Sequence, residues 1–501
     1  MPMMNGFVPK KIQPWIYVFF AFLFQLAGGM YAGAMPHVMG DMCIMREDVT
    51  MIVLCGVIGV NMPFPFLFRF KFRFTNRQLL ITAALAIAAC NWLCMYTESV
   101  PVLCLLSYVA GFFKLCGTFE CMSNIQLWMT SKRDFTIFFP LLYCIVLGDM
   151  SLSSWITVHL TYIFQSWYAM HWAMTGAMLF IALMMYVLTH DFRFMKPLPL
   201  ISLDWLGCVL WSALLIEVVF LFNYGEYYNW WDGRPFRVVT FMVPVTFYFA
   251  LQRMRHIRHP YIAPEAWLYK RLLPLLAVFA LVELINSTPK ILQNTFTSGV
   301  LHFGAMSTSV FYLVEWAGTI CGCMFVMFWI KVLRQKFTRL LTVGLMSLLA
   351  YEVQMYLIIT PGLDIASFYL PIFCRTFGVA IFFTALTIYL EELMPFQHFF
   401  MGLTMVGFIR NGVVDTICSG IYSFSLRHHI AENFARAMPY DATQVILVSL
   451  KQLFGVTCII ATVVLLIFLV WDIQPVRDTL KRMPYWSVVG RLLRRQMSSG
   501  K

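Results

Sequence analysis

Long apolar runs, repeated along almost the whole sequence, constrain this chain more than any other feature. Runs long enough to cross a hydrocarbon core occur at about 14–35, 49–68, 78–97, 101–126, 136–160, 167–189, 204–224, 235–252, 271–292, 305–330, 338–359, 367–390, 398–421 and 446–471. In lipid only helices or closed barrels satisfy every backbone group, and these runs are too long for barrel strands. The sequence therefore predicts an all-α polytopic membrane protein with fourteen transmembrane helices.

Charged residues are scarce and unevenly placed. The chain is 60% hydrophobic and 12% charged, against about 25% charged in soluble domains. With the N-terminus inside, nearly all lysines and arginines of the connections fall on the cytoplasmic side, and the opposite connections hold only Arg46, Arg234, Arg237, Arg427 and Arg436. This positive-inside pattern predicts a multi-pass protein of the plasma (inner) membrane with both termini in the cytoplasm. The net charge of +12 then reflects topology and indicates no nucleic-acid partner.

Several functional classes are disfavoured. Cys43 is the only cysteine in an expected external loop, so no disulfide framework is predicted. No Walker A motif is present, the connections leave no room for an ATP-binding domain, and no histidine or cysteine group has metal-ligand spacing, so we expect no cofactor and no metal. Gly148-Asp149 and Tyr440-Asp441 resemble the paired aspartates of intramembrane proteases, but Asp441 falls in an external loop. An enzyme is therefore not expected.

A repeat indicates how the helices are grouped. The basic connections 69–81 and 331–343 both place Phe-Thr before an arginine and a Leu-Leu pair, and they follow the second and the tenth run. These positions are equivalent if two related sets of six helices flank an inserted pair, as in transporters with paired halves. The predicted domains are a cytoplasmic N-terminus (1–13), a six-helix bundle (14–189), two inserted helices (204–252), a second bundle (271–471) and a basic cytoplasmic tail (472–501).

Short segments resemble the major facilitator superfamily, specifically its fourteen-helix drug:proton antiporter branch of the EmrB/QacA type. The segments are Leu203-Asp204-Trp205-Leu206-Gly207, Gly225 with Trp230-Trp231, Arg258-His259-Pro260, Leu268-Tyr269-Lys270-Arg271, Gln165-Ser166-Trp167 and Arg410-Asn411-Gly412. The resemblance implies two six-helix bundles plus two inserted helices and exchange of protons for small compounds. We also expect Asp204 to cap the first inserted helix.

The chain departs from that branch at several motifs. The first run lacks the usual acid, Lys114 is the nearest cation to the arginine expected in the fourth helix, and the fifth helix reads Gly148 to Ser153 in place of a Gly-Pro-rich motif. The sequence is thus similar to a divergent member. These departures keep open a facilitator or uptake carrier for a native metabolite, without proton exchange, and more remotely a non-transporting scaffold.

Ionisable residues inside the runs are the candidate site residues, because each is costly in lipid unless it is paired or hydrated. A carboxylate that alternates between apolar and cation-paired surroundings can bind and release a proton. We assign this proton-coupling role to Asp149, Glu283 or Glu315, which lie near the middle of their runs. Further candidates, as counter-charges or polar cavity residues, are Arg410, Asn411, Asp415, Lys114 and Glu120. Static ion pairs between helices would explain each of them as well.

The function expected from the sequence is secondary active transport, by alternating access, with proton-coupled efflux of small amphipathic compounds or drugs. Its partners are a small-molecule substrate, protons and the lipid bilayer. The polar segment 422–445 is expected to be the longest external loop, where a periplasmic adaptor protein would bind. Pro289 is expected to break its helix next to Glu283, and Asn61, Pro63 and Pro65 to interrupt the second helix.

Overall fold

The computed structural model describes residues 3–470 except 28–29, 130–134, 194–196, 198, 201–202, 270, 334–336 and 437–440. Thirteen helical segments in this part of the chain are long and apolar enough to cross a membrane. The remaining expected run, 398–421, lies in a further long helical segment that carries Arg410 and Asp415. The all-α, multi-pass architecture is thus confirmed, and the basic tail 472–501 lies outside the described residues.

The N-terminal half contains six spanning segments. In chain order its helices are α1 (Gln13–Leu26), α2 (Met30–Met42), α3 (Arg46–Asn61), α4 (Leu67–Arg73), α5 (Asn76–Cys94), α6 (Val100–Met129), α7 (Phe135–Phe164) and α8 (Tyr168–Leu188). The second segment is interrupted after Asn61 and continues through a short 3-10 turn at Phe64–Phe66 into α4. Prolines at 63 and 65 remove backbone donors there, so the expected interruption is confirmed.

The C-terminal half also contains six segments. Its helices are α11 (Leu272–Asn286), α12 (Ala305–Phe328), α13 (Phe337–Ile358), α14 (Tyr369–Leu393), α15 (Phe396–Gly407), α16 (Asp415–Arg436) and α17 (Ala442–Val470). The break expected at Pro289 is confirmed: α11 ends at Asn286, and π-helical turns follow at Pro289–Gln293 and Thr295–Val300. A third π-helical stretch, Phe408–Val414, joins α15 to α16.

One expected loop is wrong. The segment 422–445 was expected to be an external loop, but α16 runs on to Arg436 and α17 begins at Ala442. Arg436 pairs with Glu432 one turn earlier at 2.5 Å, and the Asn433 amide donates to Ser449 Oγ on α17 at 2.8 Å. The polar composition marks where the apolar span ends, but the helix continues beyond it because these pairs support further turns.

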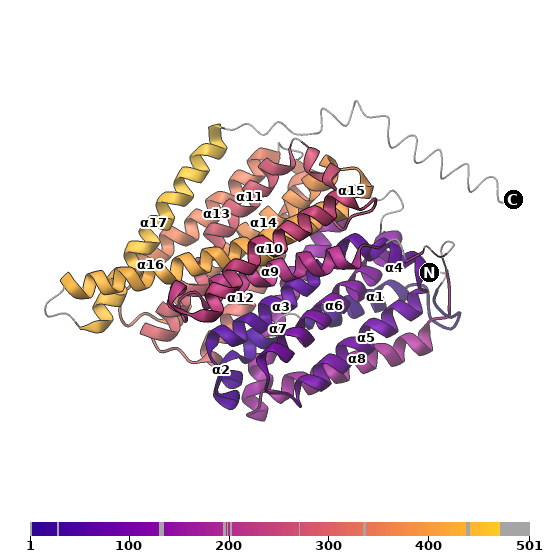
Figure 1. Ribbon diagram of the computed structural model, residues 1–501, viewed down its shortest axis with the longest axis horizontal. Helices are drawn as coiled ribbons and strands as arrows, with labels where there is room; N and C mark the ends of the chain where they lie inside the picture. Colours follow the sequence, from indigo (N-terminus) through magenta and orange to yellow (C-terminus); the bar gives the residue numbers. More distant parts are fainter. Residues whose placement is uncertain are drawn as a thin grey trace.

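The two halves repeat the same packing. In the N-terminal half α3 packs on α6 and α5 on α8, and in the C-terminal half α12 packs on α14 and α13 on α17. Glycines permit the first contact of each half: a Cβ on Gly59 would lie 2.1 Å from the Tyr108 carbonyl oxygen, and one on Gly318 2.1 Å from Thr376 Oγ1. Figure 1 shows the two halves side by side. The exact domain boundaries stay a prediction.

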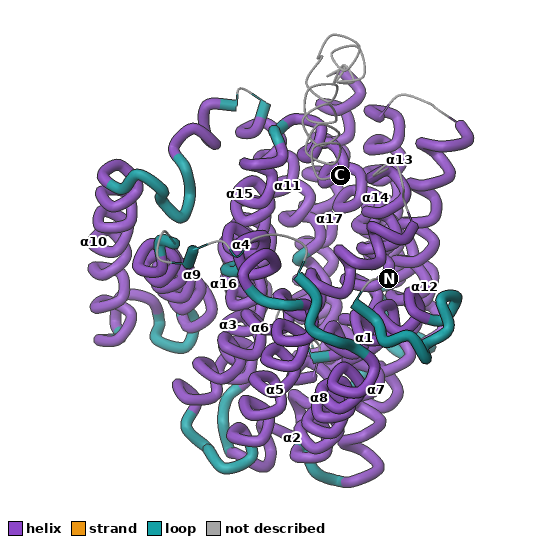
Figure 2. Tube along the Cα trace, turned by 90° about the vertical axis from the view of Figure 1, so that its right-hand side faces the viewer, coloured by secondary structure: helices purple, strands orange, loops and turns teal. Residues whose placement is uncertain are grey.

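The halves meet along several helix contacts, with the inserted helices beside them. The α7 helix packs on α12 and α14, and α3 packs on the π-helical stretch Phe408–Val414 and on α15. The inserted helices are α9 (Trp205–Tyr224) and α10 (Arg234–His256). The first packs on α3 and α16, and the second lies at the outer edge against α9 (Figure 2). Helix α9 therefore joins the insertion to both halves.

Asp204 anchors the insertion at its start. Its carboxylate accepts hydrogen bonds from the Gly207 amide at 2.9 Å, the Tyr261 amide at 3.1 Å and Arg253 Nε at 2.6 Å. The expected helix cap is thus confirmed. The same carboxylate also joins the end of α10 and the link to the C-terminal half.

Candidate functional site

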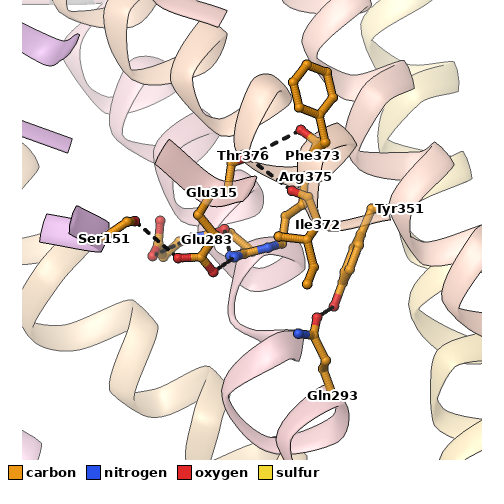
Figure 3. Close-up of polar contacts among 10 residues, drawn as sticks. Ser151, Glu283, Gln293, Glu315, Tyr351, Ile372, Phe373, Arg375 and Thr376 are labelled. Carbon is orange, nitrogen blue, oxygen red and sulfur yellow. Dashed lines mark hydrogen bonds and ion pairs between the residues drawn. The ribbon is translucent and has the colours of Figure 1, made fainter. Parts of the chain in front are cut away.

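An ion pair on the C-terminal half is hydrogen-bonded to the N-terminal half. Arg375 Nη2 on α14 lies 2.6 Å from Glu315 Oε1 on α12, and Ser151 on α7 donates its hydroxyl to Glu315 Oε2 at 3.1 Å (Figure 3). Glu315 is ten residues into its helix, about 15 Å from the start at 1.5 Å per residue. The pair therefore lies near the middle of the membrane-spanning part, where the halves meet.

Glu283 is connected to the same arginine through an amide. Arg375 Nη1 donates to Asn286 Oδ1 at 3.3 Å, and Asn286 Nδ2 donates to Glu283 Oε1 at 3.2 Å. The second carboxyl oxygen of Glu283 is buried and has no hydrogen-bond partner within the described chain. The structure thus joins two of the three predicted proton-coupling acids, Glu283 and Glu315, through Arg375 and Asn286.

Two further cations of this half, Lys290 and Arg410, interact with Asp415 and Glu283. Lys290 and Asp415 form an ion pair, and Arg46 Nη2 at the start of α3 donates to the Lys290 carbonyl oxygen at 2.9 Å. The guanidinium of Arg410 lies over the Phe383 ring, 3.5 Å from its centroid, and interacts electrostatically with Glu283 and Asp415. Arg410 is thus near Glu283, whereas the counter-charge of Glu315 is Arg375.

Asp149 and Lys114 form a separate pair of charges in the N-terminal half. Both side chains are buried, on α7 and α6, and they interact electrostatically. They form no ion pair within 4.0 Å, and Asp149 Oδ2 has no hydrogen-bond partner in the part of the chain that the structure describes. Asp149 lies two residues before Ser151 on α7 and therefore on a different face of the helix, so this pair is separate from the Glu315–Arg375 pair.

Two further candidates have different positions. Glu120 contacts Lys71 Nζ at 3.2 Å and accepts from Asn76 Nδ2 at 2.6 Å, where α4 ends and α5 begins. It thus belongs to a network at one end of the N-terminal half, away from the Glu315 pair. The side chain of Asn411, a further candidate, lies outside the described residues.

Sequence reasoning missed three residues of this region. Arg375, the partner of Glu315, was not among the candidate site residues, and neither were Ser151 and Glu352. An arginine inside an apolar run signals that an acid must lie nearby, because an unpaired charge in lipid is costly. No spacing rule identifies which acid, since the partners are on different helices.

The arrangement permits proton binding at the carboxylate of Glu315. The side chain of Glu315 is 22% exposed, whereas Asp149 and Glu283 are buried. A proton on Glu315 would neutralise the carboxylate that holds both Arg375 and Ser151. The described residues include no group of three histidines, cysteines or acids that could hold a metal ion.

Comparisons with known proteins identify the fold. No protein-family model and no curated protein matches the sequence. An auto-inhibited POT-family peptide transporter is similar in structure, with a TM-score of 0.57 and 15% identity over 93% of this chain and 99% of that chain. A mutant of a POT peptide transporter gives 0.59 and 14% over 93% and 96%. The human organic anion transporter MFSD10 (TETRAN) gives 0.53 and 10% over 91% and 100%. The chain therefore has the fold of the major facilitator-type transporters.

Proposed function

We propose that this protein is a secondary active transporter that works by alternating access and couples substrate movement to protons. The observation that carries the proposal is the Glu315–Arg375 ion pair, which belongs to one half and accepts a hydrogen bond from Ser151 of the other. A contact of this kind makes the junction between the halves depend on the charge of one carboxylate.

The proposed cycle starts from the paired state. With Glu315 ionised, Arg375 and Ser151 both bind it and the halves are joined at the centre. Proton binding removes the charge-assisted bonds, which are about twice as strong as neutral ones, and favours separation of α7 from α12. Arg375 is then free to form a stronger contact with Asn286 and, through it, with Glu283.

Small amphipathic compounds are the proposed cargo, moved outward in exchange for protons. The short segments that resemble the drug:proton antiporter branch support this direction. The structural neighbours are named for peptides and organic anions, so these classes belong in the same substrate panel. The proposed location is the plasma (inner) membrane with both termini in the cytoplasm, as the positive-inside pattern favours. Because α16 ends at Arg436 and α17 begins at Ala442, an adaptor would contact the ends of these two helices.

Transport in liposomes tests the proposal. The purified protein is reconstituted with and without an imposed pH gradient, and lipophilic cations, peptides and organic anions are offered in turn. We expect gradient-dependent movement of at least one class, with proton flux on adding it. Transport at the same rate with and without the gradient would indicate a facilitator. Absence of any transport, or of proton flux when substrate is added, would contradict the proposal.

A further inference from the structure

Glu352 is an acid on α13 that the proposed cycle does not use. Its side chain is 0% exposed, and its two oxygens face two threonines of other segments. Thr288 Oγ1, at the break after α11, lies 2.8 Å from Oε1, and Thr457 Oγ1, on α17, lies 2.6 Å from Oε2. The carboxyl group thus joins three segments that are far apart in the sequence.

If Glu352 is ionised, the two threonine hydroxyls cannot supply a hydrogen to all four oxygens that they contact. Thr288 Oγ1 also lies 3.0 Å from the Ile285 carbonyl oxygen, and Thr457 Oγ1 lies 2.9 Å from that of Phe454. Each hydroxyl carries one hydrogen, so two hydrogens face four acceptor oxygens. With an ionised Glu352 two of the four contacts lack a hydrogen. A hydrogen on the carboxyl group fills a third contact, because the carboxylic acid then donates to one threonine oxygen.

Glu352 forms no ion pair of its own among the described residues. The cation that acts on it electrostatically is Arg375 on α14, which is already paired with Glu315 at 2.6 Å. The other titratable groups near it are Tyr351 on its own helix, Tyr422 on α16 and Cys458 on α17, none of which is a cation. A buried carboxylate that accepts only hydroxyl hydrogens is costly in lipid, whereas the neutral acid is not.

We propose that Glu352 is a neutral carboxylic acid that fastens the break after α11 to α13 and α17 and thereby positions Asn286 and Glu283. Thr288 is two residues after Asn286, and Pro289 has no backbone donor to continue the helix. The break is therefore a place where the segment can bend, and side-chain hydrogen bonds add to the backbone bonds that remain there. Tyr351 makes a second hydrogen bond from α13 to this region, since its hydroxyl donates to Gln293 Oε1 at 3.0 Å (Figure 3).

Infrared difference spectroscopy tests the protonation state and does not depend on transport. Spectra of the wild type and of Glu352→Gln are compared at about pH 8, far above the ordinary glutamate pKa of about 4.3. We expect the carbonyl stretch of a protonated carboxylic acid in the wild type and its loss in Glu352→Gln, while the exposed control Glu98→Gln retains it. A difference spectrum between the wild type and Glu352→Gln that shows carboxylate bands in place of this band overturns the proposal.

Transport tests the positioning role, which rests on the proposed function. Glutamine donates and accepts as the neutral acid does, so Glu352→Gln should keep the wild-type rate and pH profile. Glu352→Leu removes both contacts, and with Glu283 misplaced we expect at least about a tenfold loss of rate and a shifted pH profile in a monodisperse protein. A wild-type pH profile in Glu352→Leu, or equal loss in both variants, contradicts the positioning role. If the wild type transports nothing, the proposed function fails while the infrared result still decides the protonation state.

Discussion

The pair between Glu315 and Arg375 predicts a stability change that follows from its burial. Their side chains are 22% and 13% exposed, so water screens the charges little. Removing one partner of a buried pair costs about 3–5 kcal/mol, because the other charge stays buried and uncompensated. In Glu315→Gln the amide can still accept from Ser151 or Arg375. We therefore expect the free energy of unfolding to fall by about 3 kcal/mol, the lower end of that range.

A double-mutant cycle separates the pair from other effects of the substitution. The double variant Glu315→Gln with Arg375→Gln removes both charges. Its loss of unfolding free energy should therefore be smaller than the sum of the two single losses, by at least about 2 kcal/mol. Equilibrium unfolding in mixed micelles with increasing SDS, followed by far-UV circular dichroism, measures these free energies. The exposed Glu98→Gln should change stability by less than about 0.5 kcal/mol. Single losses that add within about 0.5 kcal/mol would refute the pairing.

Three further predictions concern the fold and its orientation. Gly59→Val should destabilise the protein by about 1–3 kcal/mol or more, because its side chain would enter the α6 backbone, whereas Gly176→Val has open space and should be tolerated. Asp204→Ala should cost about 2 kcal/mol or more in unfolding measurements, since it leaves Arg253 and two backbone donors without their carboxylate, and equal stability would contradict the anchor. An impermeant maleimide should label exposed Cys43 in intact cells but not Cys43→Ser, and labelling only after permeabilisation would reverse the topology.

Helix number and helix breaks were predictable because they are local. A spanning helix needs about twenty apolar residues, and a proline removes a backbone donor at a known position, so both can be read from consecutive residues. The end of α16 was not predictable in this way. A helix ends where its apolar span ends only if no contact stabilises further turns. In α16, contacts of Glu432, Asn433 and Arg436 stabilise the turns beyond the apolar span.

The site was predictable as a set of residues but not as a set of pairs. Glu283 and Glu315 were selected because charge inside an apolar run needs a reason, and the structure connects them. Arg410, expected as a counter-charge, lies over Phe383 near Glu283, while Arg375 binds Glu315. Partner choice depends on how α12 and α14 are rotated and packed, and close approach at Gly318 sets that packing. Such information is not contained in the spacing of charges along the chain.

The central claim is that one carboxylate, Glu315, links proton binding to movement of the two halves. The most direct measurement compares wild type and Glu315→Gln in the same liposomes, first for exchange of labelled for unlabelled substrate and then for accumulation driven by a pH gradient. We predict that the variant exchanges substrate but no longer accumulates it, because its amide cannot bind and release the proton. Gradient-driven accumulation at the wild-type level in Glu315→Gln would contradict the claim.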